Sequence, residues 1–164
     1  AIATFKQFDN KFDEIDSVLQ RFPVINNRLE WVKEVNGINF YNDSKSTNVS
    51  SAIAAVNAFE KKNIFLIAGG DSKGQNLSLF SKALKNKIRK LYLIGKDAEL
   101  IKDACKSLEV EIKILKTMKE ATLQAFNDAK PEDIILLAPA CASYDMYRNY
   151  IERGNDFKSI VANY

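Results

Sequence analysis

The pattern of apolar and polar positions along the chain predicts an α/β fold. In some segments apolar residues recur at helical spacing, as at Val49, Ile53 and Val56, whereas others are short, almost wholly apolar runs typical of strands covered on both faces. The expected helices span residues 2–11, 13–21, 48–60, 77–86, 97–107, 117–129 and 155–163. The expected strands that alternate with them span residues 63–68, 90–94, 110–115 and 133–138. This alternation favours right-handed βαβ units and a Rossmann-like, mostly parallel sheet with helices on both faces.

Residues 29–43 depart from this alternation and predict an antiparallel β-hairpin. The runs "LEWVKEV" and "INFYNDS" flank Asn36-Gly37, the strongest short-range signal for a two-residue hairpin turn. Before the hairpin, Pro23 ends two short amphipathic helical patterns, and the first of these starts without a capping residue. We interpret residues 1–25 as a helical remnant or linker from a preceding domain, and residues 26–164 as one α/β domain.

Composition narrows the classes of function. The chain has 164 residues and a net charge of +3, with interspersed charges that do not favour a nucleic-acid-binding face. It contains no apolar run of transmembrane length, and its two cysteines form no metal or redox pattern, so we expect a protein of the reducing cytoplasm with no membrane contact. We also expect a monomer. Histidine is absent, which excludes a Ser-His-Asp triad and histidine metal sites; proton transfer has to use carboxylates, lysine, tyrosine, substrate or water.

The first stretch with candidate chemistry is "NDSKSTNV", residues 42–49, where a strand passes into a helix. A helix N-terminus with free N–H groups beside Lys45 is a typical anion site, and Asp43 can accept a hydrogen bond or help to hold a cation. The alternative is that Thr47 or Asn48 simply caps the helix and that Lys45 is solvated.

The second stretch is "AGGDSKGQN", residues 68–76. Gly69 and Gly70 allow a sharp turn after the strand, which presents Asp71 and Lys73 at the rim of the sheet. The stretch matches neither the P-loop nor the G-x-G-x-x-G pattern, and an ordinary surface turn is the alternative.

The third stretch is "LLAPACASYDMYRNYIERGNDF", residues 136–157. Its small residues let a ligand approach the backbone, and Ser143 can donate or accept a hydrogen bond. We interpret Cys141 as a small packed residue, and Ser143 has no base to make it a nucleophile. Because ligands of open α/β sheets bind beyond the carboxyl ends of the strands, Lys45, Thr47, Lys73 and Ser143 are expected on one rim, as a pocket for a dicarboxylate or a phosphate.

In their order and spacing, "NDSKSTN", "AGGDSKG" and the third stretch resemble the carboxy-terminal domain of the Mur ligases, and among them the enzymes that add D-glutamate. The resemblance covers residues 27–164. It implies a protein of three domains, which bind in turn a UDP-sugar, ATP with Mg²⁺, and the incoming amino acid. It also implies that ATP phosphorylates UDP-N-acetylmuramoyl-L-alanine, and that the amine of D-glutamate attacks the acyl phosphate.

The resemblance also implies roles for residues of this chain. Thr47, Lys73 and Ser143 would hold the carboxylates of D-glutamate, and Tyr144 and Tyr150 would line that pocket. The remaining implied assignments are Lys45 at the reacting centre, and Arg28 and Asp43 near ATP, with no metal held by this domain.

The sequence departs from the family pattern at several positions. Asn27 replaces a common histidine, Ser72 a frequent glycine, and Tyr144 and Tyr150 the commoner leucine and phenylalanine. The chain also has no P-loop, so we expect a fragment that binds D-glutamate, holds no ATP or Mg²⁺ by itself, and is inactive alone. The alternatives are a stand-alone Rossmann-like module that binds a small anionic metabolite, and a sister ligase that adds a diamino acid or dipeptide.

Overall fold

The computed structural model describes residues 25–60 and 63–164; the two helices expected at 2–11 and 13–21 lie outside them. The described residues form a six-stranded sheet in the order β1-β2-β6-β3-β4-β5. The strands are β1 (Glu30–Val35), β2 (Ile38–Asn42), β3 (Ile64–Gly69), β4 (Ile88–Ile94), β5 (Glu111–Ile114) and β6 (Ile134–Leu137). Among the strand pairs of the described residues, only β1–β2 is antiparallel, which confirms the mostly parallel α/β sheet with a hairpin at its edge.

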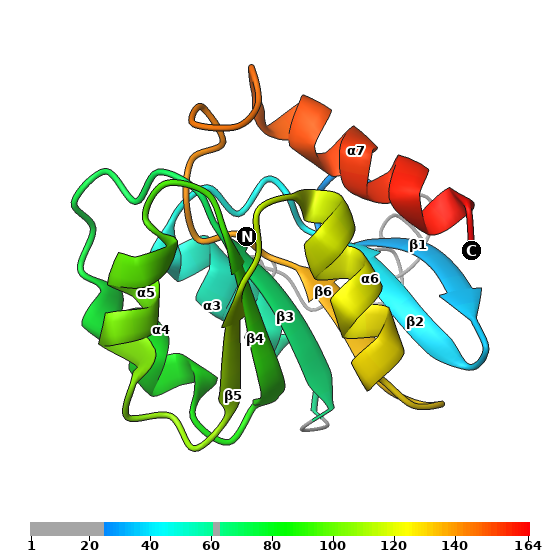
Figure 1. Cartoon of the computed structure of the whole chain (residues 1–164), viewed down its shortest axis with the longest axis horizontal. Helices are drawn as coiled ribbons and strands as arrows, with labels where there is room; N and C mark the ends of the chain where they lie inside the picture. Colours follow the sequence, from blue (N-terminus) through cyan, green and yellow to red (C-terminus); the bar gives the residue numbers. More distant parts are fainter. Residues whose placement is uncertain (1–24, 61–62) are drawn as a thin grey trace, which may run out of the picture.

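Helices cover both faces of this sheet, as predicted (Figure 1). They are α3 (Val49–Asn57), α4 (Leu77–Leu84), α5 (Ala98–Cys105), α6 (Met118–Asp128) and α7 (Tyr150–Ala162). Successive residues of β3 serve opposite faces: Leu66 packs in the core cluster of α3, α4 and α5, whereas Phe65 and Ile67 pack in that of α6 and α7. All six residues of β3 are buried, which explains its uninterrupted apolar sequence.

The hairpin has the turn that its sequence predicts. Val35 pairs with Ile38 across the turn, and Asn36 and Gly37 have φ values of 52° and 77°. Positive φ at both central residues is the requirement of a type I′ turn, which asparagine and glycine meet at low cost. The hairpin therefore adds an antiparallel edge to the parallel sheet.

Helix α7 begins five residues before its predicted start at residue 155. The Asn149 side chain caps it by accepting a hydrogen bond of 2.9 Å from the Glu152 amide, and the Glu152 carboxylate accepts one of 2.7 Å from the Arg148 amide. Such reciprocal capping stabilises a first helical turn. Gly154 lies inside the helix because a Cβ there would overlap the Asn27 side chain. The earlier start is what places Tyr150 and Arg153 on a rigid element.

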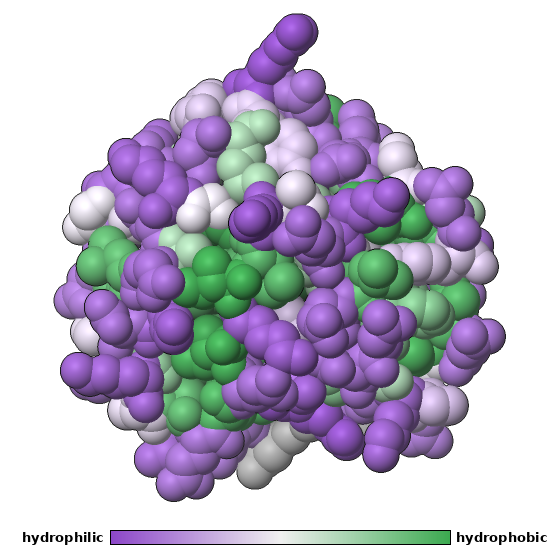
Figure 2. All heavy atoms as spheres, in the orientation of Figure 1, coloured by the Kyte–Doolittle hydropathy of each residue, from purple (hydrophilic) through white to green (hydrophobic). Residues whose placement is uncertain are grey.

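The outer surface is mixed. On the face shown in Figure 2, hydrophilic side chains cover most of the surface and apolar groups gather in separate patches. Exposed large apolar side chains include Trp31 on β1 and Leu123 on α6. Within the two described ranges of the chain, no helix combines the length and the apolar character needed to cross a bilayer.

Candidate functional site

The three stretches with candidate chemistry leave neighbouring strands of the sheet. The first loop (residues 43–48) follows β2, the second loop (residues 70–76) follows β3, and the third loop (residues 138–149) follows β6. Strand β6 lies between β2 and β3 and runs parallel to both. Their carboxyl ends therefore share one edge of the sheet, and the structure brings the three loops together there.

Backbone hydrogen bonds join the second and third loops. Asp71 and Ala142 exchange two of them, of 3.0 and 2.9 Å, and the Gly69 amide donates one of 2.8 Å to Pro139. Gly70 makes the approach possible, since its φ is 128° and a Cβ there would overlap the Ala142 carbonyl oxygen. Gly69 and Gly70 thus allow the second and third loops to pack closely, in addition to allowing the turn after β3.

Gln75 connects the start of α3 with the second and third loops, and no local sequence pattern pointed to it. Its Oε1 accepts a 2.9 Å hydrogen bond from the amide of Val49, the first residue of α3. Its Nε2 donates to the carbonyl oxygens of Ser72 at 2.9 Å and Ala140 at 3.4 Å. One side chain thus satisfies backbone groups contributed by three separate segments, a relationship that no local pattern encodes.

The N-terminus of α3 is less open than predicted. Asn48 caps the helix, its Oδ1 accepting a hydrogen bond of 2.9 Å from the Ser51 amide, and Gln75 occupies the Val49 amide. The prediction of free amides is therefore wrong for these two positions, because side chains of the chain itself bind them. Thr47 does not cap the helix, and no hydrogen bond joins its hydroxyl to the described part of the chain.

Two lysines at this edge lie over tyrosine rings. Lys45 Nζ is 4.0 Å from the centre of the Tyr150 ring, and Lys73 Nζ is 5.1 Å from that of Tyr144. Neither lysine forms an ion pair with a carboxylate of residues 25–60 or 63–164, whereas the nearby Lys96 does pair with Asp71 at 3.8 Å. Cation–π contacts hold an ammonium in place without neutralising it. Both charges therefore remain available to an anion.

Ser143 lies at the start of a tight turn in the third loop. Its carbonyl oxygen accepts hydrogen bonds from the amides of Met146 at 3.0 Å and Tyr147 at 2.8 Å. The residue is 3% exposed, and its hydroxyl makes no hydrogen bond to the part of the chain that the structure describes. The Lys73 ammonium lies over the ring of Tyr144, the residue after Ser143. The turn therefore fixes the backbone of Ser143, and Lys73 contacts the adjacent residue, Tyr144.

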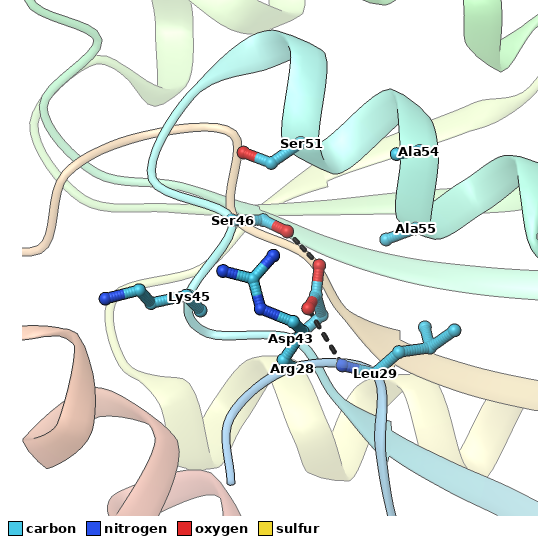
Figure 3. A pocket seen from close by; sticks show the side chains of 8 residues that line it. All are labelled: Arg28, Leu29, Asp43, Lys45, Ser46, Ser51, Ala54 and Ala55. Carbon is cyan, nitrogen blue, oxygen red and sulfur yellow. Dashed lines mark hydrogen bonds between the residues drawn. The ribbon is translucent and has the colours of Figure 1, made fainter. Parts of the chain in front are cut away.

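A pocket of about 280 Å³ lies between the first loop and α3 (Figure 3). Its lining includes Arg28, Asp43 and Lys45, three of the predicted site residues; Thr47, Lys73 and Ser143 do not line it. The predicted residues thus divide into two groups: Arg28, Asp43 and Lys45 line this pocket, and the other five do not.

Asp43 is fully engaged within the protein. Its Oδ1 accepts a 2.8 Å hydrogen bond from the Leu29 amide, and its Oδ2 accepts one from the Ser46 hydroxyl. Burial raises the pKa of Asp43, although these hydrogen bonds and the Arg28 charge act in the opposite direction. The carboxylate therefore fixes the backbone next to Arg28, whose side chain is exposed.

The two cysteines of the chain are packed inside the domain. Cys105 and Cys141 are free and buried, and burial raises the pKa of the Cys141 thiol to about 12. A thiol with so high a pKa is a poor nucleophile, which agrees with its interpretation as a packed residue. In the described ranges, no group of three or more acidic or cysteine side chains could hold a metal ion.

Comparison with known proteins agrees with this architecture. Residues 27–141 match the family described as "Mur ligase, glutamate ligase domain". The chain is 42% identical over 161 residues to the UDP-N-acetylmuramoylalanine--D-glutamate ligase of Nitrosomonas europaea, covering 98% of this chain and 34% of that protein. It is 45% identical over 153 residues to the protein of the same name from Thermoanaerobacter sp. (strain X514), covering 92% and 34%. The chain thus spans about a third of the length of the curated relatives it matches.

Solved structures share the fold at low sequence identity. The UDP-N-acetylmuramate-alanine ligase of Thermotoga maritima superposes with a TM-score of 0.63 at 16% identity, over 99% of this chain and 36% of that one. The bifunctional folylpolyglutamate synthase/dihydrofolate synthase of Yersinia pestis gives 0.65 at 14% identity, over 97% and 36%. The family match extends over all six strands of the described sheet and over the first two candidate loops. The chain belongs to the Mur ligase family and carries its C-terminal, glutamate ligase domain.

Proposed function

We propose that this chain is the amino-acid-binding part of an ATP-dependent ligase that adds D-glutamate to UDP-N-acetylmuramoyl-L-alanine through an acyl phosphate. The names of its curated relatives support the substrate, and their identity of 42–45% extends across nearly the whole chain. The reaction belongs to the synthesis of peptidoglycan precursors in the cytoplasm, and so to cell-wall growth, cell shape and division.

In this proposal, the amino acid binds where the three loops meet. D-Glutamate carries two carboxylates, and Lys73 offers an ammonium with no ion-pair partner in the described residues. Thr47 and Ser143 add hydroxyls, while Tyr144 and Tyr150 provide walls. Charge-assisted hydrogen bonds of this kind contribute about 1.5–3 kcal/mol each, enough to orient a small dianion. Holding both carboxylates leaves the amine free to attack an acyl carbon.

The pocket beside α3 faces the phosphate chemistry in this proposal. Arg28 and Lys45 place two cations around it, and Asp43 holds the backbone that presents Arg28. Positive charge there would stabilise the negative charge that develops as phosphate leaves. ATP would bring Mg²⁺ with it, and the described residues offer no acidic cluster to hold that ion.

The observation that carries the proposal is the pair of lysines without ion-pair partners on loops that meet at one edge. Isothermal titration calorimetry on the chain tests it directly. We expect saturable binding of one D-glutamate per chain and no comparable heat from a diamino acid such as L-lysine. Tighter binding of the diamino acid would reject D-glutamate in favour of a sister ligase.

The second half of the proposal is that the chain alone does not turn over ATP. The 164 residues contain no G-x-x-x-x-G-K-[ST] pattern, and a P-loop is what cradles the ATP phosphates in such enzymes. A phosphate-release assay with ATP, Mg²⁺, D-glutamate and UDP-N-acetylmuramoyl-L-alanine is expected to stay at the level of a protein-free control. Release that scales with the concentration of the purified chain would refute this half.

A further inference from the structure

Arg153 is the largest fully buried side chain in the described residues, at 1% exposure. It lies in the first turn of α7, beneath the first and third loops. Its Nε donates to the Ser44 hydroxyl at 3.0 Å and its Nη2 to the Ser44 carbonyl oxygen at 2.9 Å. Its Nη1 donates to the Cys141 carbonyl oxygen at 3.1 Å. One rigid, planar group thus fixes the backbones of two loops that lie about a hundred residues apart in sequence.

These contacts adjoin the residues that carry the binding chemistry. Ser44 precedes Lys45, and its hydroxyl also donates to the Tyr150 carbonyl oxygen at 2.8 Å. Tyr150 in turn supplies the ring under the Lys45 ammonium. A shift of Arg153 would therefore move the first loop, and through Cys141 the third loop, which carries Ser143.

The positive charge of Arg153 has no ion-pair partner among the described residues, unlike that of Lys158, which pairs with Glu30 at 3.1 Å. Asp145 attracts this charge from beyond ion-pair distance, although its carboxylate accepts a hydrogen bond from the Lys96 amide. Burial lowers the pKa of Arg153 to about 10, so the group stays charged at neutral pH.

A buried charge is unfavourable unless something compensates it. The carbonyl dipoles of Ser44 and Cys141 and the charge of Asp145 do so in part here, and an anion bound at the first and third loops would complete the compensation. A negatively charged ligand at this edge is therefore attracted by Arg153, and a ligand with two negative charges is attracted more strongly than a ligand with one.

We propose that Arg153 is a positioning residue of the amino-acid site, which holds the first and third loops in register and favours a doubly negative ligand through its buried charge. The inference rests on the proposed function for the identity of the ligand. This role differs from those proposed for Lys73, Thr47 and Ser143, because Arg153 does not contact the ligand. It acts by holding the loop backbones and by the electrostatic attraction of its buried charge.

Calorimetry with D-glutamate and D-glutamine separates charge from shape, since D-glutamine has the same size and one carboxylate fewer. The first variant, Arg153→Met, removes both the charge and the hydrogen bonds of the guanidinium. The second, Arg153→Lys, keeps the charge but not the planar guanidinium. Phe157→Leu is the matched control, since Phe157 is fully buried one turn later on α7 and packs in the core cluster of α6 and α7. We expect R153M to weaken D-glutamate binding at least about 10-fold and D-glutamine binding only about 3-fold, with R153K in between.

Equal losses for the two amino acids in R153M, or losses matched by F157L, would overturn the role of the charge.

A second measurement needs no ligand. Hydrogen exchange of the Lys45 amide, which donates to Asn27, and of the Ala142 amide, which donates to Asp71, reports the order of the loops. R153M and R153K are expected to speed both about 10-fold or more, and F157L to leave them nearly unchanged.

The two experiments distinguish this inference from the proposed function. Unchanged exchange in both Arg153 variants would reject the positioning role, even if D-glutamate binds the native chain. Faster exchange in these variants, together with no binding of D-glutamate by the native chain, would support the positioning role and count against the proposed ligand. Should R153M not fold, Arg153→Gln, which removes the charge and keeps N–H donors, carries the ligand comparison, and R153K carries the exchange comparison.

Discussion

Asp71 and Ala142 exchange two backbone hydrogen bonds, of 3.0 and 2.9 Å, and so tie the loop after β3 to the loop after β6. The residues lie 71 positions apart in the sequence, yet they pair like neighbours in a hairpin. This bridge lies at the base of the candidate site, between Lys73 on one side and Ser143 on the other. Its stability therefore bears on the geometry of both groups.

A glycine substitution at the bridge tests this coupling. Gly70→Ala places a methyl group against the Ala142 carbonyl oxygen and forces a φ of 128° on a residue with a side chain. We expect a loss of about 2–4 kcal/mol in the free energy of unfolding, measured by urea titration.

Gly74→Ala is the control for this substitution. Gly74 also has a positive φ, of 70°, but no heavy atom lies within 4 Å of the position of its Cβ. It should lose only the cost of the left-handed conformation, about 1–2 kcal/mol. Equal losses in the two variants would show that the close approach at Gly70 does not matter.

Removing the charge of Lys73 tests the amino-acid site. Lys73→Met keeps most of the apolar stem and removes an ammonium that has no carboxylate partner in the described residues. Affinity for D-glutamate is expected to fall about 10- to 100-fold, the size of a lost charge-assisted hydrogen bond, with the free energy of unfolding within about 0.5 kcal/mol of native.

Lys85→Met changes net charge equally at an exposed position just after α4. Its affinity for D-glutamate should match that of the native chain when both are measured by calorimetry at the same ionic strength. A similar loss in K85M would mean that the effect comes from overall charge and not from the site.

Acid should weaken the fold through Asp128 on α6. Burial alone would raise the pKa of this carboxyl. The Tyr92 hydroxyl donates a hydrogen bond to it at 2.8 Å, and the ammonium groups of Lys90 and Lys113 both lie at 3.1 Å. Together these interactions outweigh burial and hold the pKa of Asp128 at about 2. A carboxyl whose pKa is lower in the folded than in the unfolded state stabilises the fold above its unfolded pKa of about 3.9. That contribution is lost as the pH falls from about 4 to 2.

Asp128→Asn should therefore lower the free energy of unfolding by about 1–2 kcal/mol at pH 7, after allowance for solvent screening. The difference from native should shrink through the same pH interval. The exposed Asp103→Asn, on α5, serves as the control. A difference between D128N and native that is as large at pH 2 as at pH 7 would contradict the assigned network.

The two thiols provide a test of loop packing. Burial raises the pKa of Cys105 to about 11 and that of Cys141 to about 12. Neither should react with a thiol reagent at pH 8 in the folded chain, and both should react in denaturant. Cys141 in the third loop is the informative one, with Cys105 on α5 as the internal reference. Fast labelling of Cys141 alone would show that the third loop opens.

Local patterns predicted most of the fold. The apolar runs at 63–68 and 133–138 became β3 and β6, and Asn36-Gly37 formed the expected turn, because each signal depends on neighbours in the sequence. The capping pair Asn149 and Glu152 also lay in the sequence and would have placed the start of α7.

The connections between the loops could not be predicted in the same way. Nothing local indicates that β6 inserts between β2 and β3, and that order is what brings the three loops together. Glutamine and arginine are usually exposed, so no sequence pattern indicates that Gln75 and Arg153 bind the backbones of the loops. The occupied amides at the start of α3 follow from the same cause, since Gln75 reaches Val49 from another loop.

Mapping of amide chemical shifts during titration with D-glutamate tests the central claim most directly. The account predicts saturable changes confined to residues 45–47, 71–74 and 141–150, which come from three separate segments. Changes centred on the opposite end of the sheet, around residues 85–88 and 107–110, or the absence of any saturable change, would contradict it.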